Sequence, residues 1–231
     1  MRRNARRNRV EYIHNEVIDM VVEDGAVKAI ILRSGQNIAT DNVVNAAGAR
    51  AANVAWLAGI EVPIEARRRY TYIFEVDDPL PEDLPLTIDP SGVHLRPYGA
   101  KDYLVGCPPI GPDNAVDVDD FDFAEDAWNE KIFPIISHRI PQFKSARVIN
   151  PWMRHYEFNV FDHSAIVGPH SNIGNFCFIA GFSGHGSQQA PACGRGISEL
   201  IVHGGFKTLD LGVLSYLRIP EGQPLMERAV I

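Results

Sequence analysis

The first 60 residues contain short apolar runs separated by turn residues, a pattern that predicts a small β-meander followed by a helix. Residues 16–23 and 26–33 are strand-like apolar runs and flank Asp24-Gly25, a dipeptide typical of a tight hairpin turn. The other expected elements are strands at 10–13 and 41–45 and a short helix at 51–57. This pattern is half of a dinucleotide-binding domain without its opening βαβ unit.

Strand-like runs recur between residues 61 and 160, where prolines punctuate the connections. We expect strands at 69–76, 92–96, 102–106 and 147–150, which together predict a mostly antiparallel sheet. Residues 123–138 predict one helix, with a potential break at Pro134.

Further strands are expected at 165–168 and 176–180, and an amphipathic helix follows the second of them. The apolar face predicted for that helix consists of Ala190, Cys193, Ile197, Leu200 and Ile201.

The connection AGFSGHGSQQA at residues 180–190 joins that last strand to the helix. Its glycines Gly181, Gly184 and Gly186 let the backbone approach a flat or anionic ligand closely. The helix N-terminus behind them offers unpaired N–H groups and a positive dipole end. Pro191 is tolerated because it falls in the first helical turn. Strand, glycine turn and helix therefore predict a cofactor cradle.

Two other interpretations of this turn remain open. The spacing G-x-x-G-x-G differs from the dinucleotide fingerprint G-x-G-x-x-G, so the glycines could simply form a tight turn under a closely packed helix. A serine hydrolase using Ser183 and His185 is a remote alternative, because the G-x-S-x-G elbow would need glycine where His185 stands.

Three segments together resemble the D-amino-acid oxidase superfamily of FAD-dependent oxidoreductases, which includes sarcosine, glycine and dimethylglycine oxidoreductases. AGFSGHG at 180–186, with QQAPACGR at 188–195, resembles its C-terminal flavin-contacting segment, and DNVVNAAGA at 41–49 resembles its second flavin-side segment. The tail GGFKTLDL at 204–211 also fits.

The resemblance implies an α/β (α+β) fold in which an antiparallel-sheet substrate domain interrupts a partial FAD-binding dinucleotide fold. We expect the FAD-binding parts at 1–60 and 161–231 and the substrate domain at 61–160. Because the first βαβ unit is missing, we interpret the chain as the C-terminal portion of such an enzyme, truncated at its N-terminus.

The same resemblance implies which residues line the site. The expected substrate-side residues are His94, Arg96, Arg154 and Tyr156. The expected FAD-binding residues are Val17, Ala47, Gly48, Gly181, Ser183, Gly184, His185, Gly186, Ser187 and Gln188. The implied reaction oxidises a C–N bond of a small amine or amino acid by hydride transfer to flavin N5. A non-catalytic assembly or binding protein with the same fold is the main alternative.

Two departures from sarcosine-oxidase-like members refine this expectation. Residues 154–156 contain no cysteine for covalent attachment, so we expect non-covalent FAD. No lysine stands on the strand around 103–105, where those members place their oxygen-activating lysine. We therefore favour a dehydrogenase with a possible electron-transfer partner.

Composition limits the remaining classes. A net charge of −7 argues against a nucleic-acid binder, although residues 1–9 carry five arginines, which we expect on a solvated helix. No apolar run is long enough to span a bilayer, and the scattered histidines suggest no metal site. Three widely spaced cysteines fit reduced thiols in a bacterial cytoplasm, with a mitochondrial matrix as the alternative. The oligomeric state stays open.

Overall fold

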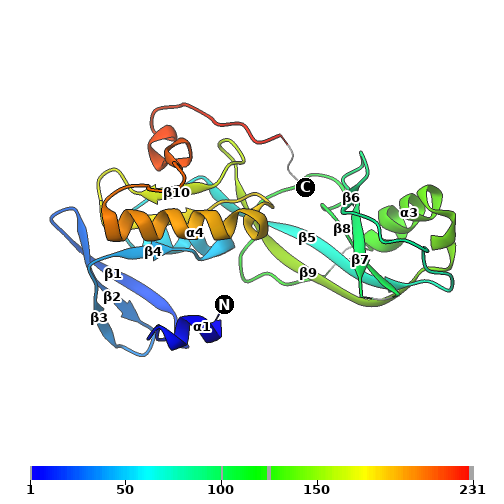
Figure 1. Cartoon of the computed structure of the whole chain (residues 1–231), viewed down its shortest axis with the longest axis horizontal. Helices are drawn as coiled ribbons and strands as arrows, with labels where there is room; N and C mark the ends of the chain where they lie inside the picture. The colour runs from blue at the N-terminus through cyan, green and yellow to red at the C-terminus, as the bar shows by residue number, and fades with distance from the viewer. Residues whose placement is uncertain (1, 100, 124–125, 229–231) are drawn as a thin grey trace.

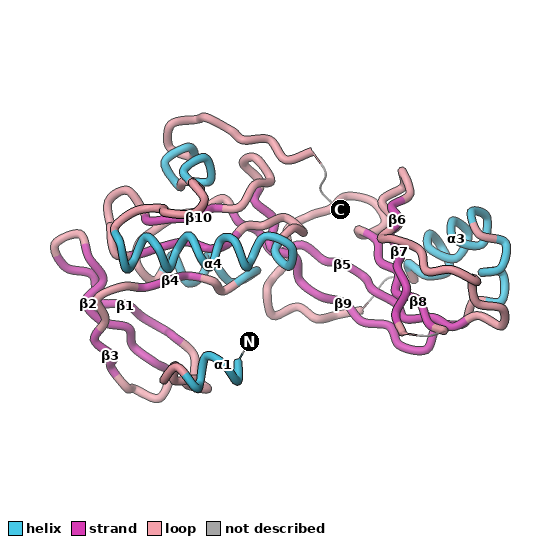
Figure 2. Tube along the Cα trace, in the orientation of Figure 1, coloured by secondary structure: helices cyan, strands magenta, loops and turns pink. Residues whose placement is uncertain are grey.

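The structure is a computed structural model that describes residues 2–99, 101–123 and 126–228. Its strands form three sheets, with the orders β1-β2-β3, β10-β11-β4 and β6-β7-β8-β5-β9. The first sheet and the five-stranded sheet lie toward opposite ends of an elongated molecule (Figures 1 and 2). This mixed α/β fold with antiparallel sheets agrees with the expected fold class.

The N-terminal meander consists of β1 (Val17–Glu23), β2 (Ala26–Leu32) and β3 (Asn37–Ala39), all antiparallel. Asp24 and Gly25 both have positive φ, of 50° and 69°, as the expected tight hairpin turn requires. The strand expected at 10–13 is wrong. Those residues are exposed and irregular, and Tyr12 packs against guanidinium groups of α1 (Arg2–Arg7) instead of pairing with a strand.

The second sheet sits beneath the longest helix. β4 (Val43–Asn45) runs parallel to β11 (Phe176–Ala180), which pairs antiparallel with β10 (Ile166–Pro169). The helix α4 (Gly186–His203) lies along this sheet (Figure 1). The helix α2 (Ala51–Trp56) contributes to the same hydrophobic core as β4 and β11.

The buried face of α4 differs from the predicted one. Cys193, Gly196 and Ile197 are buried, whereas Ala190 and Ile201 are exposed. Gly196 accounts for this difference in the buried face, because a Cβ at Gly196 would lie 2.6 Å from Leu211 Cδ1. The C-terminal segment thus packs where the glycine leaves room.

The five-stranded sheet is built around two long strands, β5 (Ile64–Glu75) and β9 (Arg147–Asn159), which pair antiparallel along their whole length. Its other strands are β6 (Thr87–Ile88), β7 (His94–Tyr98) and β8 (Asp102–Cys107). One face carries an apolar core that includes Tyr70, Phe74, Val105, Ile136 and Phe143.

The helix α3 (Phe133–Arg139) covers that core face (Figure 1). A π-helical segment at Trp128–Ile132 leads directly into α3, and Pro134 lies in the first turn of α3. The chain stays helical through Pro134, and the change from π- to α-helical hydrogen bonding just before the proline accommodates its missing N–H. The predicted start at 123 is wrong: Phe123 and Asp126 are irregular, and Asp126 Oδ1 accepts the N–H of Asn129 where the helix begins. Residues 124–125 lie outside the described residues.

Short 3₁₀ segments complete the structure at Gly48–Arg50, Pro141–Ser145, Gly212–Leu214 and Tyr216–Arg218. The expected boundaries at 60 and 160 fall just outside β5 and β9, and the division into domains itself stays a prediction. Within the described ranges, none of the helices is sufficiently long and apolar to cross a membrane.

Candidate functional site

The glycine turn between β11 and α4 has an unusual backbone. Gly181, Ser183 and Gly184 all have positive φ, of 75°, 46° and 97°. Of these, only Ser183 carries a side chain, so its conformation must be held by its surroundings. The turn ends at Gly186, the first residue of α4, whose opening N–H groups have no partner within the helix. Ser187 and Gln188 of that first turn are exposed, so this positive helix end faces outward.

Glu157 of β9 holds the turn in place. Its Oε2 accepts the N–H of Gly181 at 2.8 Å, and its carboxyl group also accepts from the backbone of Phe182. Its main-chain carbonyl accepts the N–H of Ser183 at 3.0 Å. Burial raises the pKa of the Glu157 carboxyl, and the two backbone donors oppose that rise. Sequence reasoning missed Glu157, although its position next to Tyr156 was the available signal.

Tyr156 meets the turn directly. A Cβ on Gly184 would lie 3.1 Å from Tyr156 Cε2, so only glycine allows this approach without a shift. The Arg69 guanidinium carbon lies 4.1 Å from the centroid of the Tyr156 ring, a close cation–π contact. Burial raises the pKa of Tyr156 to about 12, and the neighbouring Arg69 charge opposes the rise.

The Tyr156 hydroxyl oxygen is buried, and no described residue gives it a hydrogen bond of good geometry. A buried hydroxyl without a partner costs free energy of roughly 1–3 kcal/mol. This atom therefore marks a place where a bound molecule could supply the missing partner.

The expected substrate residues all lie on one face of the five-stranded sheet, opposite the core and α3. The strand register links them: His94 pairs with Gly106, which pairs with Thr71 of β5. Thr71 pairs in turn with Trp152 of β9, and alternate residues of β9 place Arg154 and Tyr156 on the same face as Trp152. However, β7 is separated from β9 by β8 and β5, a spacing of about 14 Å. His94 and Arg96 thus share the face of Tyr156 without adjoining it.

His94 and Arg154 have contrasting surroundings. Burial lowers the pKa of His94; the hydrogen bond from its Nδ1 to the Gly92 carbonyl opposes this, and the charge of Arg69 adds to it. Arg154 is exposed, with its guanidinium 5.9 Å from the Trp152 ring. Arg96 is also exposed and donates to the Pro97 carbonyl.

The second predicted flavin loop lies at the same sheet edge as the glycine turn. β4 and β11 are parallel neighbours, so the loops after their carboxyl ends emerge together. Gly48 has φ +59°, and the N–H of Ala47 donates to the buried side chain of Asn45 at 3.2 Å. Val17 lies apart on β1, where it packs against the core under that sheet.

The remote hydrolase interpretation finds no support in this geometry. The Ser183 hydroxyl is fully buried, accepts the N–H of Asn159 at 3.0 Å and lies 3.4 Å from the Gly181 carbonyl. A nucleophile must be exposed to its substrate, whereas this hydroxyl stabilises the turn from within.

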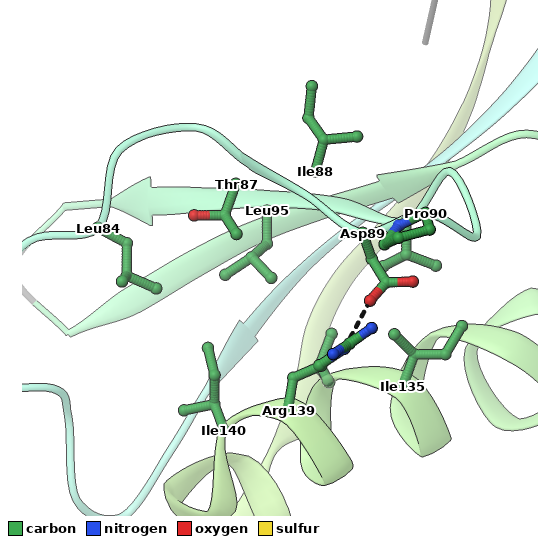
Figure 3. A pocket seen from close by; sticks show the side chains of 11 residues that line it. Leu84, Thr87, Ile88, Asp89, Pro90, Leu95, Ile135, Arg139 and Ile140 are labelled. Atoms are coloured by element: carbon green, nitrogen blue, oxygen red, sulfur yellow. Dashed lines mark hydrogen bonds and ion pairs between the residues drawn. The ribbon is translucent and has the colours of Figure 1, made fainter.

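Two hollows lie near these elements. A pocket of about 270 Å³ beside the start of α4 is lined by His163, Phe182, His185 and Gln189 among others. A groove of about 490 Å³ lies on the α3 side of the five-stranded sheet (Figure 3), between β6–β7 and α3, with the Asp89–Arg139 ion pair on its wall. The groove is on the opposite face from Tyr156. Among the described residues, no cluster of three or more His, Cys, Asp or Glu side chains could hold a metal ion.

Comparison with known proteins identifies the family. The sequence model "DAO: FAD dependent oxidoreductase" matches residues 1–200. The chain belongs to the DAO family of FAD-dependent oxidoreductases. It is 38% identical to FAD-dependent oxidoreductase domain-containing protein 1 of Xenopus laevis over 208 residues. The aligned region covers 85% of this chain and 42% of that protein. The homolog of that protein in Drosophila melanogaster is 37% identical over 196 residues, 80% of this chain and 37% of the relative.

Solved structures agree with this family. L-proline dehydrogenase from P. horikoshii superposes with a TM-score of 0.79 at 25% identity, over 91% of this chain and 55% of that one. Glycine oxidase from Geobacillus kaustophilus gives 0.72 at 18% identity, over 88% of this chain and 52% of that one, a likeness of fold alone. The DAO-family chain thus spans about two fifths to slightly over half of these relatives.

FAD is the cofactor of this DAO family, and the residues at the turn fit it. The absence of a side chain on Gly184 lets the turn lie close to the Tyr156 ring, and the first turn of α4 directs N–H donors outward, as an electron-rich ring edge requires. The unpartnered Tyr156 hydroxyl lies beside this turn.

Proposed function

We propose that this chain carries the substrate face and the flavin-edge turn of an FAD-dependent dehydrogenase that oxidises a C–N bond of a small amine or amino acid. The contact between Tyr156 and Gly184 carries the proposal, because it joins the substrate face of β9 to the helix end that fits the flavin. When bound, FAD supplies the hydride acceptor.

The residues of the chain have distinct roles in this proposal. Gly184, Gly186 and the N–H groups opening α4 hold the flavin edge and stabilise negative charge there, with Gly48 approaching from the neighbouring loop. Arg154 binds the substrate carboxylate through its planar fork. Tyr156 closes the site against water at the turn.

The electron acceptor in this proposal is a partner other than oxygen. Residues 102–107 of β8 contain no lysine, the residue that sarcosine-oxidase-like members use on this strand to activate oxygen. The cofactor is non-covalent FAD, since residues 154–156 contain no cysteine. We place the protein in a bacterial cytoplasm, or alternatively in a mitochondrial matrix.

The test is bleaching of bound flavin absorbance by amines without oxygen, in the longer protein to which this chain is homologous in part. Replacing Arg154→Met should raise KM for a carboxylated amine far more than for a neutral amine. Arg33→Met serves as control, because the Arg33 side chain, in the turn that follows β2, forms an exposed ion pair with Glu16. Flavin that no amine bleaches would favour the non-catalytic assembly protein, and an unchanged KM would remove Arg154 from substrate binding.

A further inference from the structure

Two arginines lie directly opposite each other on the Tyr156 face of the five-stranded sheet. Arg69 of β5 pairs in register with Arg154 of β9. Side chains opposed in this way have Cβ atoms about 5 Å apart, and like charges in such a pair repel each other. This part of the face therefore favours bound anions.

Asp113 already supplies one of these anions. Its two carboxylate oxygens accept from both terminal nitrogens of Arg69, each at 2.9 Å, in a bidentate pair. The Arg69 side chain is only 13% exposed and that of Asp113 31%, so solvent screens this pair less than a surface one.

The segment that carries Asp113 is tied to the sheet on both sides of the ion pair. Ala115 bridges to Arg67, and the N–H of Val116 donates to the Ala66 carbonyl at 2.9 Å. Asp120, further along, forms an ion pair with Arg68. The carboxylate of Asp113 is thus held at Arg69 by the fold.

Arg154 is the other arginine of the pair, and its guanidinium group is accessible to a ligand. It is exposed, and no carboxylate among the described residues forms an ion pair with it. A ligand carboxylate reaching this face would therefore find one free guanidinium group, beside a second one that is already neutralised.

We propose that Arg69 and Arg154 form a paired anion subsite in which Asp113 permanently occupies one place. The site then accepts an amine with one carboxylate, held by Arg154, and rejects an amine with two. This inference rests on the proposed function for the nature of the ligand, and it makes Asp113 a specificity-determining residue.

The test measures ligand binding to the full chain by calorimetry, with glycine as the monocarboxylate probe and iminodiacetate as the dicarboxylate probe. Wild type should bind glycine at least as tightly as iminodiacetate. Asp113→Asn frees Arg69 and should tighten iminodiacetate binding about tenfold, while glycine affinity changes much less. Asp120→Asn is the matched control, because it removes the ion pair of the same segment with Arg68 and should leave the ratio unchanged.

An unchanged ratio in folded Asp113→Asn would overturn the proposal, as would the absence of saturable binding of both probes to wild type. If Asp113→Asn does not fold, Asp113→Glu keeps the charge and should retain the wild-type ratio, whereas Arg69→Met leaves the Asp113 carboxylate without its cation and should weaken iminodiacetate binding further relative to glycine. A change of ratio in this chain, together with flavin that no amine bleaches in the longer protein, supports the subsite and removes the enzymatic function. Oxidation of monocarboxylate amines with no change of ratio removes the subsite alone.

Discussion

Glu157 Oε2 accepts the backbone N–H of Gly181 at 2.8 Å, so a carboxylate on edge strand β9 holds the turn that precedes α4. The same residue accepts the N–H of Ser183 through its main-chain carbonyl. A substrate-side strand and a cofactor-side turn are thereby joined at one residue.

Glu157→Ala should lower the free energy of unfolding by about 1–3 kcal/mol, because it leaves buried backbone donors of the turn without an acceptor. Glu157→Gln keeps one carbonyl oxygen and should cost less. Urea denaturation measures both, with the exposed Glu221→Ala as control. Equal stabilities of Glu157→Ala and wild type would show that the turn is held by other contacts.

The stability of wild type relative to Glu157→Gln should fall as pH rises. Burial raises the pKa of Glu157 above its ordinary 4.5, so the native state binds this proton more tightly than the unfolded state. The contribution is present below the unfolded pKa and is lost as pH rises through the folded pKa. Urea denaturation of both proteins at several pH values from about 4 to about 7 checks the sign. A difference that grows with pH would contradict it.

Gly184→Ala should destabilise the protein by about 1–3 kcal/mol, because φ of +97° strains an alanine and the new Cβ meets the Tyr156 ring. Gly194→Ala is the matched control in α4, because a Cβ at Gly194 meets nothing within 4 Å. This substitution should stabilise the protein by up to about 1 kcal/mol. Thermal unfolding measures both changes. Shifts of the same sign would show that the turn tolerates a side chain.

The isolated 231-residue chain should bind FAD weakly or not at all, should show no amine-dependent turnover, and should tend to associate. The FAD pyrophosphate normally rests on a helix N-terminus after G-x-G-x-x-G, a sequence absent from these 231 residues. Val44 on β4 is 40% exposed, which leaves apolar surface open. Flavin absorbance per chain, alone and with a supplied N-terminal βαβ segment, is the measurement. Stoichiometric FAD on the chain alone would refute this prediction.

Sequence patterns predicted the structural features that depend on interactions between neighbouring residues. Asp24-Gly25 predicted its hairpin because few residues accept two successive positive φ angles. The strand at 10–13 failed for the complementary reason: its apolar residues suit a strand, but Tyr12 found guanidinium partners in α1. Gly196 likewise shifted the buried face of α4 through Leu211, a contact that helical periodicity does not contain.

Prediction of the candidate site was limited in the same way, by contacts between residues far apart in the sequence. Motif resemblance singled out Tyr156 and Gly184, and the structure brings them into contact. It could not find Glu157, whose partner Gly181 is 24 residues away, or the Arg69–Asp113 pair, which spans 44 residues. Such pairs depend on strand register, which the alternation of one strand leaves undetermined. The roles of the site residues stay predictions.

Because β9 continues from the sheet into the hydrogen bonds of the glycine turn, the turn cannot open independently of that strand. The Asn159 N–H donates to the Ser183 hydroxyl and the Ser183 N–H donates to Glu157, so main chain and side chain close a small ring of bonds. The amides of Gly181 and Ser183 should therefore exchange deuterium as slowly as those at the end of β9, and far more slowly than a fraying helix start. The cofactor-side turn would then belong to the same cooperative opening unit as the substrate sheet.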